Sequence, residues 1–208
     1  MRALLLDFNG TLSEDEPILC RIFQELFAEA GKPIGEEEYY EQLAGFSDRE
    51  VIRLWLGRED PLLEQRKIDR YRELADGSTV SDEAREAVRV AAEEVPLAVV
   101  SGSARAEIEP VLEAAGIRDR FTVVVSLDDI RRSKPDPEGY LIALHLLGVE
   151  GSAAAAVEDS PAGVAAAKAA GLYTVGVTTT QPAERLAEAD EVADGVDRDL
   201  IARLLSSA

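Results

Sequence analysis

Short apolar runs alternate with helical patterns along most of the chain, and this alternation limits the folds that the chain can adopt. The first run, residues 3–6, is broken at once by Asn9-Gly10, so we expect a buried strand there rather than a helix. Strands that alternate with helices imply right-handed crossovers and a parallel, doubly wound sheet, which is an α/β fold. The expected strands are 3–6, 97–100, 122–125, 153–157 and 173–177, and the expected helices cover about 82–94, 104–115, 137–147 and 161–170.

The ends of several expected helices carry recognisable signals. Ser81 and Ser103 are placed to accept hydrogen bonds from the first turn of a helix, as N-cap residues do. Gly116, Gly148 and Gly171 stand where three helices should end, because glycine readily adopts the left-handed conformation that follows a helix. These signals mark where the expected helices begin and end.

One long segment, residues 14–79, interrupts the alternation. It shows only helical periodicity, with apolar residues such as Ile18 and Ile22 spaced for one face of a helix. We therefore expect an all-helical insert after the first strand. On this division, residues 1–13 and 80–208 form an α/β core domain, and residues 14–79 form a small inserted helical domain.

The charge balance excludes some classes of partner. The 208 residues include 41 acidic and 22 basic ones, for a formal net charge of −19. A nucleic-acid-binding protein would normally present a basic face, so we expect no nucleic-acid partner. An anionic substrate would meet a repulsive average field. A phosphate site in this chain must therefore be made locally positive by a cation, a lysine and backbone N–H groups.

Other features bear on the cellular setting. No apolar run is long enough to cross a bilayer, so no membrane association is expected. Residues 1–7 are too short and soon too acidic for a signal peptide, and the single Cys20 excludes an intramolecular disulfide. We expect a cytoplasmic protein that is a monomer or a weak homo-oligomer.

Polar residues follow the expected strands directly. In open parallel sheets, ligands bind beyond the carboxyl ends of the strands, and those ends share one edge. The residues at this edge should be Asp7, Ser101-Gly102, residues 126–129 and Glu158-Asp159. The sequence therefore predicts a polar, largely acidic site at the carboxyl edge of the sheet.

Four segments of the chain, given below, resemble the four motifs of the haloacid dehalogenase (HAD) superfamily and occur in the same order. The resemblance covers essentially the whole chain. It is closest to subfamily I, with a helical cap, and to β-phosphoglucomutase-like phosphatases. Each segment alone is a weak signal, but their order and spacing together are specific. The segments are Asp7-Phe8-Asn9-Gly10-Thr11, Val99-Val100-Ser101-Gly102, Ser133-Lys134-Pro135-Asp136-Pro137 and Val157-Glu158-Asp159-Ser160-Pro161-Ala162-Gly163.

The resemblance implies a catalytic role for the residues after the first strand. Asp7 would attack a phosphoryl group and form an aspartyl-phosphate, which splits hydrolysis into two steps. Asn-Gly is also a hairpin signal, but no matching strand follows it. Thr11, Ser101, the N–H of Gly102 and Lys134 would bind the substrate phosphate. Thr11 would also hydrogen-bond near the nucleophile, and Lys134 would have a catalytic role as a positive charge beside Asp7.

The resemblance also implies a magnesium site. Mg²⁺ prefers carboxylates, a few carbonyls and water molecules. Its ligands would be the Asp7 carboxylate, the Asn9 backbone carbonyl and Asp159, with Glu158 binding directly or through water. Taken alone, Glu158-Asp159 also fits a helix N-cap followed by an acidic first turn.

Asn9 departs from the family pattern, in which an aspartate protonates the leaving oxygen and then activates water. An amide cannot exchange a proton in this way, and general acid–base help is worth about 10²–10⁴-fold. Three explanations are open: slow hydrolysis of esters with good leaving groups, substitution by Glu14, Asp15 or Asp48, or binding without turnover. We favour weak or narrow phosphatase activity, and expect Asn9→Asp to raise turnover.

The leading hypothesis is a Mg²⁺-dependent phosphatase for a small phosphorylated metabolite, such as a sugar phosphate. One alternative is a β-phosphoglucomutase-like phosphoryl transferase, and another is a catalytically weak phosphoester-binding protein. The segment 43–50 resembles the part of the cap that enters the cleft. A mutase usually carries a basic residue after the serine of this segment, whereas Asp48 follows Ser47 here. This difference counts against the mutase.

Overall fold

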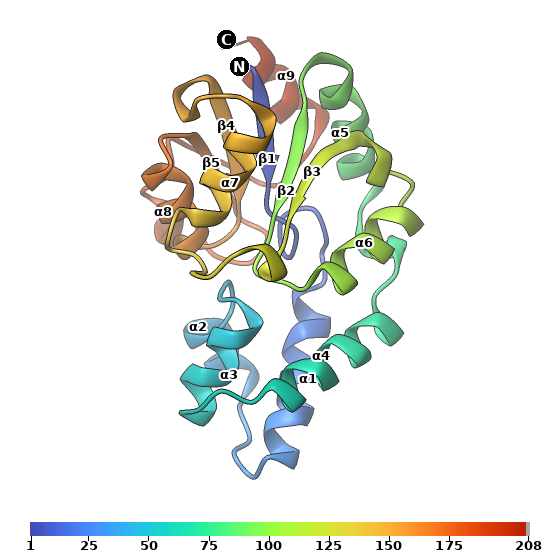
Figure 1. The fold of residues 1–208 in the computed structure, drawn as a ribbon, viewed down its shortest axis with the longest axis vertical. Helices are drawn as coiled ribbons and strands as arrows, with labels where there is room; N and C mark the ends of the chain where they lie inside the picture. The colour runs from blue at the N-terminus through green and yellow to red at the C-terminus, as the bar shows by residue number, and fades with distance from the viewer. Residues whose placement is uncertain (207–208) are drawn as a thin grey trace.

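The computed structural model describes residues 1–206 and contains a six-stranded sheet (Figure 1). Each pair of neighbouring strands is parallel, and the order is β3-β2-β1-β4-β5-β6. The predicted α/β class with a doubly wound parallel sheet is therefore confirmed. The strands are β1 (Ala3–Leu6), β2 (Leu97–Val100), β3 (Phe121–Val125), β4 (Ala154–Glu158), β5 (Tyr173–Val177) and β6 (Glu191–Ala193).

Helices cover both faces of this sheet, because successive side chains of a strand point to opposite faces and both sets are apolar. Leu4 and Leu6 of β1 pack in one buried cluster, and Ala3 and Leu5 pack in the other. The first cluster is closed by α5 (Asp82–Glu94), α6 (Arg105–Ala114) and α9 (Arg198–Ser206). The second is closed by α7 (Glu138–Leu147) and α8 (Pro161–Ala169).

Residues 14–79 form helices between β1 and α5, beside the carboxyl ends of the strands (Figure 1). The two chain termini lie at the other end of the molecule. Because the polar residues after the strands face this helical segment, any site at the sheet edge is bounded by both. The division of the chain into two domains stays a prediction. The helices are α1 (Glu16–Glu29), α2 (Glu36–Gln42), α3 (Asp48–Leu56) and α4 (Pro61–Leu74), followed by a 3-10 turn at Gly77–Thr79.

The predicted helix ends agree with the structure except in one place. Ser81 caps α5 by accepting a hydrogen bond from the Ala84 N–H. The prediction for Ser103 was wrong: the N-cap of α6 is Ala104, whose N–H donates to the Glu107 side chain. The Ser103 hydroxyl instead donates a hydrogen bond to Asn9 Oδ1 at 2.7 Å.

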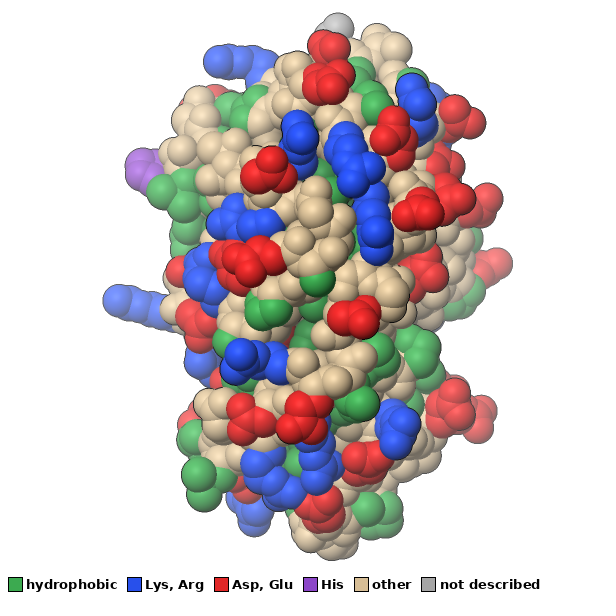
Figure 2. All heavy atoms as spheres, turned by 90° about the vertical axis from the view of Figure 1, so that its right-hand side faces the viewer, with side chains coloured by type: hydrophobic (Ala, Val, Ile, Leu, Met, Phe, Trp, Pro, Cys, Tyr) green, Lys and Arg blue, Asp and Glu red, His purple; other side chains and the backbone are tan. Residues whose placement is uncertain are grey.

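The surface carries charges of both signs. On the face shown in Figure 2, acidic and basic side chains are interspersed over the sheet region and over the helical segment. Among residues 1–206, helices both long enough and apolar enough to cross a membrane are absent. The net charge of −19 repels an anion on average, so this repulsion has to be overcome locally at the site.

Candidate active site

The predicted site residues meet at the carboxyl ends of three adjacent strands. Asp7 follows β1, Ser101 follows β2, and Glu158 is the last residue of β4. β1 lies between β2 and β4 in the sheet, so these ends are side by side. Carboxylate oxygens of Asp7, Glu158 and Asp159 lie within 4.8 Å of one another.

Lys134 forms ion pairs with two of these three carboxylates. It comes from the loop before α7, and its Nζ lies 2.5 Å from Asp7 Oδ1 and 2.6 Å from Glu158 Oε1. The ammonium also donates to the carbonyl of Val100 at 3.0 Å. Burial lowers the pKa of Lys134, but the Asp7 and Glu158 carboxylates raise it more, so its pKa lies above the ordinary value. Lys134 is therefore a fixed positive charge beside Asp7.

Glu158 is held in a buried position by its neighbours. The Tyr140 hydroxyl donates to its Oε1 at 2.5 Å. A Cβ at Gly163 would lie 1.9 Å from Glu158 Oε2, so only glycine leaves space for this carboxylate. Burial raises the pKa of Glu158 to about 8, and the Lys134 ammonium opposes the rise. Oε2 is buried without a hydrogen-bond partner in the described part of the chain.

These features fit a divalent cation. Three carboxylates face a single ammonium here, and burial raises the pKa of Asp159 as well as that of Glu158, because their negative charge lacks a matching positive one. An unpartnered buried carboxylate oxygen is costly, so Glu158 Oε2 needs a donor or a cation. Gly10 has φ +70°, and a Cβ there would lie 2.2 Å from Asp159 Oδ2, so glycine brings the loop against this carboxylate. The all-oxygen donor set is the kind that Mg²⁺ prefers.

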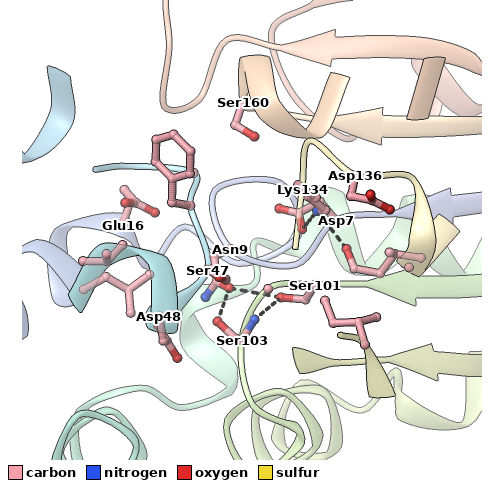
Figure 3. A pocket seen from close by; sticks show the side chains of 18 of the residues that line it. Asp7, Asn9, Glu16, Ser47, Asp48, Ser101, Ser103, Lys134, Asp136 and Ser160 are labelled. Atoms are coloured by element: carbon pink, nitrogen blue, oxygen red, sulfur yellow. Dashed lines mark hydrogen bonds and ion pairs between the residues drawn. The ribbon is translucent and has the colours of Figure 1, made fainter. Parts of the chain in front are cut away.

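The Asn9 amide is fixed by three side chains. Its Oδ1 accepts from the Ser103 hydroxyl at 2.7 Å and from the Ser101 hydroxyl at 3.4 Å, as Figure 3 shows. Its Nδ2 donates to Asp15 Oδ2 at 2.9 Å. The Tyr71 hydroxyl donates to the same Asp15 oxygen. Asn9 thus lines the pocket with an amide that is locked between hydroxyls on one side and a carboxylate on the other.

Ser101, Gly102 and Thr11 occupy different positions relative to the pocket. Ser101 and Gly102 line it, and a Cβ at Gly102 would lie 3.1 Å from the Cα of Ser47. The loop before α3 can approach so closely because Gly102 has no side chain. Thr11 was expected to bind phosphate, but its hydroxyl donates to Asp159 Oδ1 at 3.3 Å. Its contact is therefore with an expected metal ligand rather than with the pocket.

Glu14, Asp15 and Asp48 were suggested as replacements for the aspartate that is missing at position 9, and they lie in three different environments. Glu14 is exposed. Asp15 is buried against Asn9, and burial raises its pKa to about 6. Asp48 lines the pocket but is ion-paired with Lys67 at 2.7 Å. Each of the three is thus either away from the pocket or already engaged by a neighbour.

Glu16 is a pocket residue that the sequence analysis did not identify. It is the first residue of α1, it is buried, and it lines the same pocket as Asp7. The Tyr39 hydroxyl donates to its Oε1 at 2.8 Å. Burial raises the pKa of Glu16 to about 7, and the Asp15 carboxylate adds to the rise. Pro17 marks a helix start, but the sequence carries no signal that places Glu16 in the pocket.

Glu16 gives a prediction about the pH dependence of stability. Its pKa is about 7 in the fold against an ordinary 4.5, so the folded state binds this proton more tightly. The resulting stabilisation is complete below pH 4.5 and is lost as the pH rises to about 7, on the order of 3 kcal/mol. The uncharged Glu16→Gln should therefore gain stability relative to the wild type over this pH range, measured by denaturant unfolding in EDTA. The exposed Glu14→Gln should not. Identical pH slopes for the wild type and Glu16→Gln would contradict this prediction.

Comparisons with known proteins place these features in a wider context. A family model for haloacid dehalogenase-like hydrolases matches residues 1–171. The validoxylamine A 7'-phosphate phosphatase of Streptomyces hygroscopicus subsp. limoneus is 50% identical over 96 residues, 46% of this chain and 45% of that protein. A phosphoglycolate phosphatase of Pectobacterium atrosepticum is 30% identical over 188 residues, 86% of this chain and 80% of that protein. Among solved structures, a mutant of CbbY from Rhodobacter sphaeroides in complex with xylulose-(1,5)bisphosphate has a TM-score of 0.82 at 30% identity, covering 94% of this chain and 95% of that one.

Proposed function

Because this chain belongs to the haloacid dehalogenase-like hydrolase family, we propose that it is a phosphatase for a small phosphate monoester, such as a sugar phosphate. The observation that carries the proposal is the contact between Lys134 and both Asp7 and Glu158 at the edge of a pocket. This arrangement gives a carboxylate nucleophile a neighbouring positive charge, which an anionic substrate needs in so acidic a protein. Relatives whose names give phosphorylated small molecules as substrates support the same class.

The reaction would proceed in two displacements at phosphorus. In the first, an oxygen of Asp7 forms a bond to phosphorus while the bond to the ester oxygen breaks, and the leaving alcohol takes up a proton. In the second, water attacks the phosphorus of the aspartyl-phosphate and gives up a proton, releasing inorganic phosphate and restoring the Asp7 carboxylate. Both steps move negative charge onto oxygens that Lys134, Ser101 and the Gly102 N–H would stabilise.

Mg²⁺ would be held by Asp7, Asp159 and the Asn9 carbonyl, with Glu158 direct or through water. When bound, it would neutralise the charge of the carboxylates and of the substrate phosphate and so reduce their repulsion. Glu158 and Asp159 do not line the pocket, so they act on the substrate only through Asp7, Lys134 and the cation. Thr11 would hold Asp159 in orientation through its hydroxyl.

Removal of the metal gives the second prediction. Treatment with EDTA should lower phosphate release by at least about 10²-fold, and Mg²⁺ should restore it, because without the cation only the Lys134 ammonium offsets the repulsion between the carboxylates and the substrate phosphate. Asp159→Asn should raise the Mg²⁺ concentration needed for half-maximal rate by about tenfold or more. It should also reduce the rise in melting temperature that Mg²⁺ produces, which is a readout independent of turnover. The surface variant Asp119→Asn should behave as wild type in both assays, and Mg²⁺-independent turnover would contradict the proposal.

Asn9 sets the expected rate. Its amide cannot protonate the leaving oxygen, so turnover should be slow unless the leaving group departs without help. A panel of phosphate monoesters, with p-nitrophenyl phosphate as an ester of a good leaving group, tests the function directly. Phosphate release that depends on Mg²⁺ supports the phosphatase. Isomer interconversion without release would indicate a mutase, and binding without either would indicate a phosphoester-binding protein.

A further inference from the structure

A second hollow adjoins the pocket that contains Asp7. It has a volume of about 660 Å³, and its lining comes from α3 with the turn after it and from residues 127–137, the loop that leads into α7. Three residues line both the hollow and the pocket, namely Ile130, Arg132 and Asp136. The hollow therefore borders the candidate active site, but most of its lining is its own.

Four arginines line this hollow, and we call them the arginine group. Arg49 and Arg53 are one turn apart on α3, so their side chains lie on the same face of that helix. Arg131 and Arg132 come from the loop before α7. A guanidinium group can donate two parallel hydrogen bonds to a phosphate or a carboxylate. The arginine group thus brings the donors that oxyanions prefer to one hollow, from two separate parts of the chain.

The lining of the hollow is positive in a chain that is negative overall. Three carboxylates also line it, those of Glu50, Glu59 and Asp136, so the four arginines leave an excess of one positive charge. Asp136 pairs with Arg132 at 2.9 Å, and Glu50 accepts a hydrogen bond from the Ser47 hydroxyl at 2.8 Å. An anion in the hollow would therefore meet a local charge opposite in sign to the net charge of −19.

Two members of the arginine group lack a partner of their own. Within residues 1–206, the side chains of Arg53 and Arg131 make no ion pair and no hydrogen bond. Arg49 pairs with Glu64 through its Nε, at 3.1 Å, and its two terminal nitrogens have no partner in the same range. Each unpaired guanidinium keeps its five N–H donors for a ligand. The hollow therefore offers more donors than its own carboxylates use.

The loop that carries Arg131 and Arg132 is held in place by hydrogen bonds. Glu138 Oε2 accepts from the backbone N–H of Arg131 at 3.1 Å and from that of Arg132 at 2.8 Å. Further along the same loop, Lys134 contacts Asp7 at 2.5 Å. Because the backbone of this loop is already fixed, an anion that binds here does not have to order it.

We propose that the arginine group binds an anionic group, a phosphate or a carboxylate, at a site separate from the phosphoryl site at Asp7. Arg53 from the helical segment and Arg131 from the sheet region would supply the free guanidinium groups, so the bound anion would join the two parts of the molecule. The same chemistry fits two sources, a free anion or a second anionic group on the substrate. The site itself goes beyond the proposed phosphatase function, and only the second source rests on that function.

Binding of a free anion is tested without turnover. Inorganic phosphate is titrated into the protein by calorimetry at low salt and in EDTA, so that the pocket at Asp7 lacks the cation that a phosphate there would need. The double variant Arg53→Gln/Arg131→Gln should bind phosphate more weakly than the wild type by about tenfold or more, because it loses two charged donors. Its melting temperature should match that of the wild type, since neither side chain has a partner to lose within the described chain.

A matched control removes two arginines elsewhere. Arg2 and Arg72 are also exposed, lie outside the hollow, and have no side-chain partner among residues 1–206. Arg2→Gln/Arg72→Gln therefore makes the same change in net charge, and it should bind phosphate as the wild type does. Equal weakening in both double variants would indicate an effect of net charge alone and would count against the site.

Binding of a second anion on the substrate is tested by kcat/KM in Mg²⁺. Glucose 1,6-bisphosphate carries a second phosphate, whereas glucose 6-phosphate has the same sugar without it. Arg53→Gln/Arg131→Gln should lower kcat/KM for the bisphosphate by about tenfold or more and should change that for glucose 6-phosphate by less than about twofold. An equal loss for both esters would contradict a site for the second anion of the substrate.

The two assays together decide the proposal. Weaker phosphate binding by Arg53→Gln/Arg131→Gln supports a site for a free anion, and a selective loss with the bisphosphate supports a site for the substrate. A folded double variant that matches the wild type in both assays overturns the proposal. Failure of every ester, p-nitrophenyl phosphate included, overturns the phosphatase proposal alone, and the titration then decides the anion site. If the double variant has a lower melting temperature, the two single variants are measured in the same assays and decide in the same way.

Discussion

Replacement of Asp7 by Asn is expected to reduce phosphate release by about 10⁴-fold or more, since loss of a nucleophile removes the covalent route altogether. Asn has the size of Asp but lacks the carboxylate oxygen that would attack phosphorus. The fold should tolerate the change, because Lys134 keeps its contact with Glu158 at 2.6 Å. The measurement is steady-state phosphate release at saturating Mg²⁺, with the melting temperature as a test of folding.

A matched control sharpens this result. Asp119→Asn makes the same chemical change at an exposed position paired only weakly with Arg120 at 3.6 Å. It should leave turnover and melting temperature as in the wild type. If folded Asp7→Asn kept more than about a tenth of the wild-type rate, Asp7 would not be the nucleophile.

The double variant Asn9→Asp/Asp15→Asn is expected to raise turnover on esters with poor leaving groups by about 10²-fold, the lower end of general acid–base help. In the wild type, the Asn9 Nδ2 donates to Asp15 Oδ2 at 2.9 Å. The double variant exchanges the carboxylate and the amide across this hydrogen bond. A proton-exchanging group then lines the pocket, and the hydrogen bond keeps a donor and an acceptor.

The single variants provide the controls for this exchange. Asn9→Asp alone would place two carboxylates at hydrogen-bonding distance, so one would hold a proton and the gain should be smaller than in the double variant. Asp15→Asn alone should give no gain. A double variant no faster than the wild type would show that loss of the acid at position 9 does not limit turnover. Gains that simply add across the two sites would mean that the two residues act independently.

Much of the fold followed from local pattern. The alternation of apolar runs and helical segments predicted five of the strands to within one residue at each end, because buried parallel strands and amphipathic helices have different periods. β6 and α9 were missed. β6 has only three residues, Glu191–Ala193, two of them half-buried and Val192 exposed, so it lacks the apolar run that marks a buried strand.

The candidate site was predictable only in part. Asp7, Ser101 and Glu158 end or follow neighbouring strands, and strand order brings such residues together without knowledge of any side-chain contact. The contacts of Asn9 with Ser103 and Asp15 depend instead on side-chain orientation between distant segments. The same holds for the buried group of Lys67 with Asp48 and Glu107, which joins the helical segment to α6. No sequence period encodes such pairings.

The most direct measurement is the mass of the enzyme's own peptides during turnover. The protein is mixed with Mg²⁺ and excess ester, quenched in acid after one turnover time, and the tryptic peptide of residues 3–21 is fragmented in a mass spectrometer. If Asp7 is the nucleophile, the wild-type peptide should include a species heavier by one phosphoryl group, with the added mass on Asp7, and the Asp7→Asn peptide should not. Phosphate release by the wild type with no phosphorylated Asp7 at any time point, or with the phosphoryl group on another residue, would contradict the role of Asp7 as nucleophile.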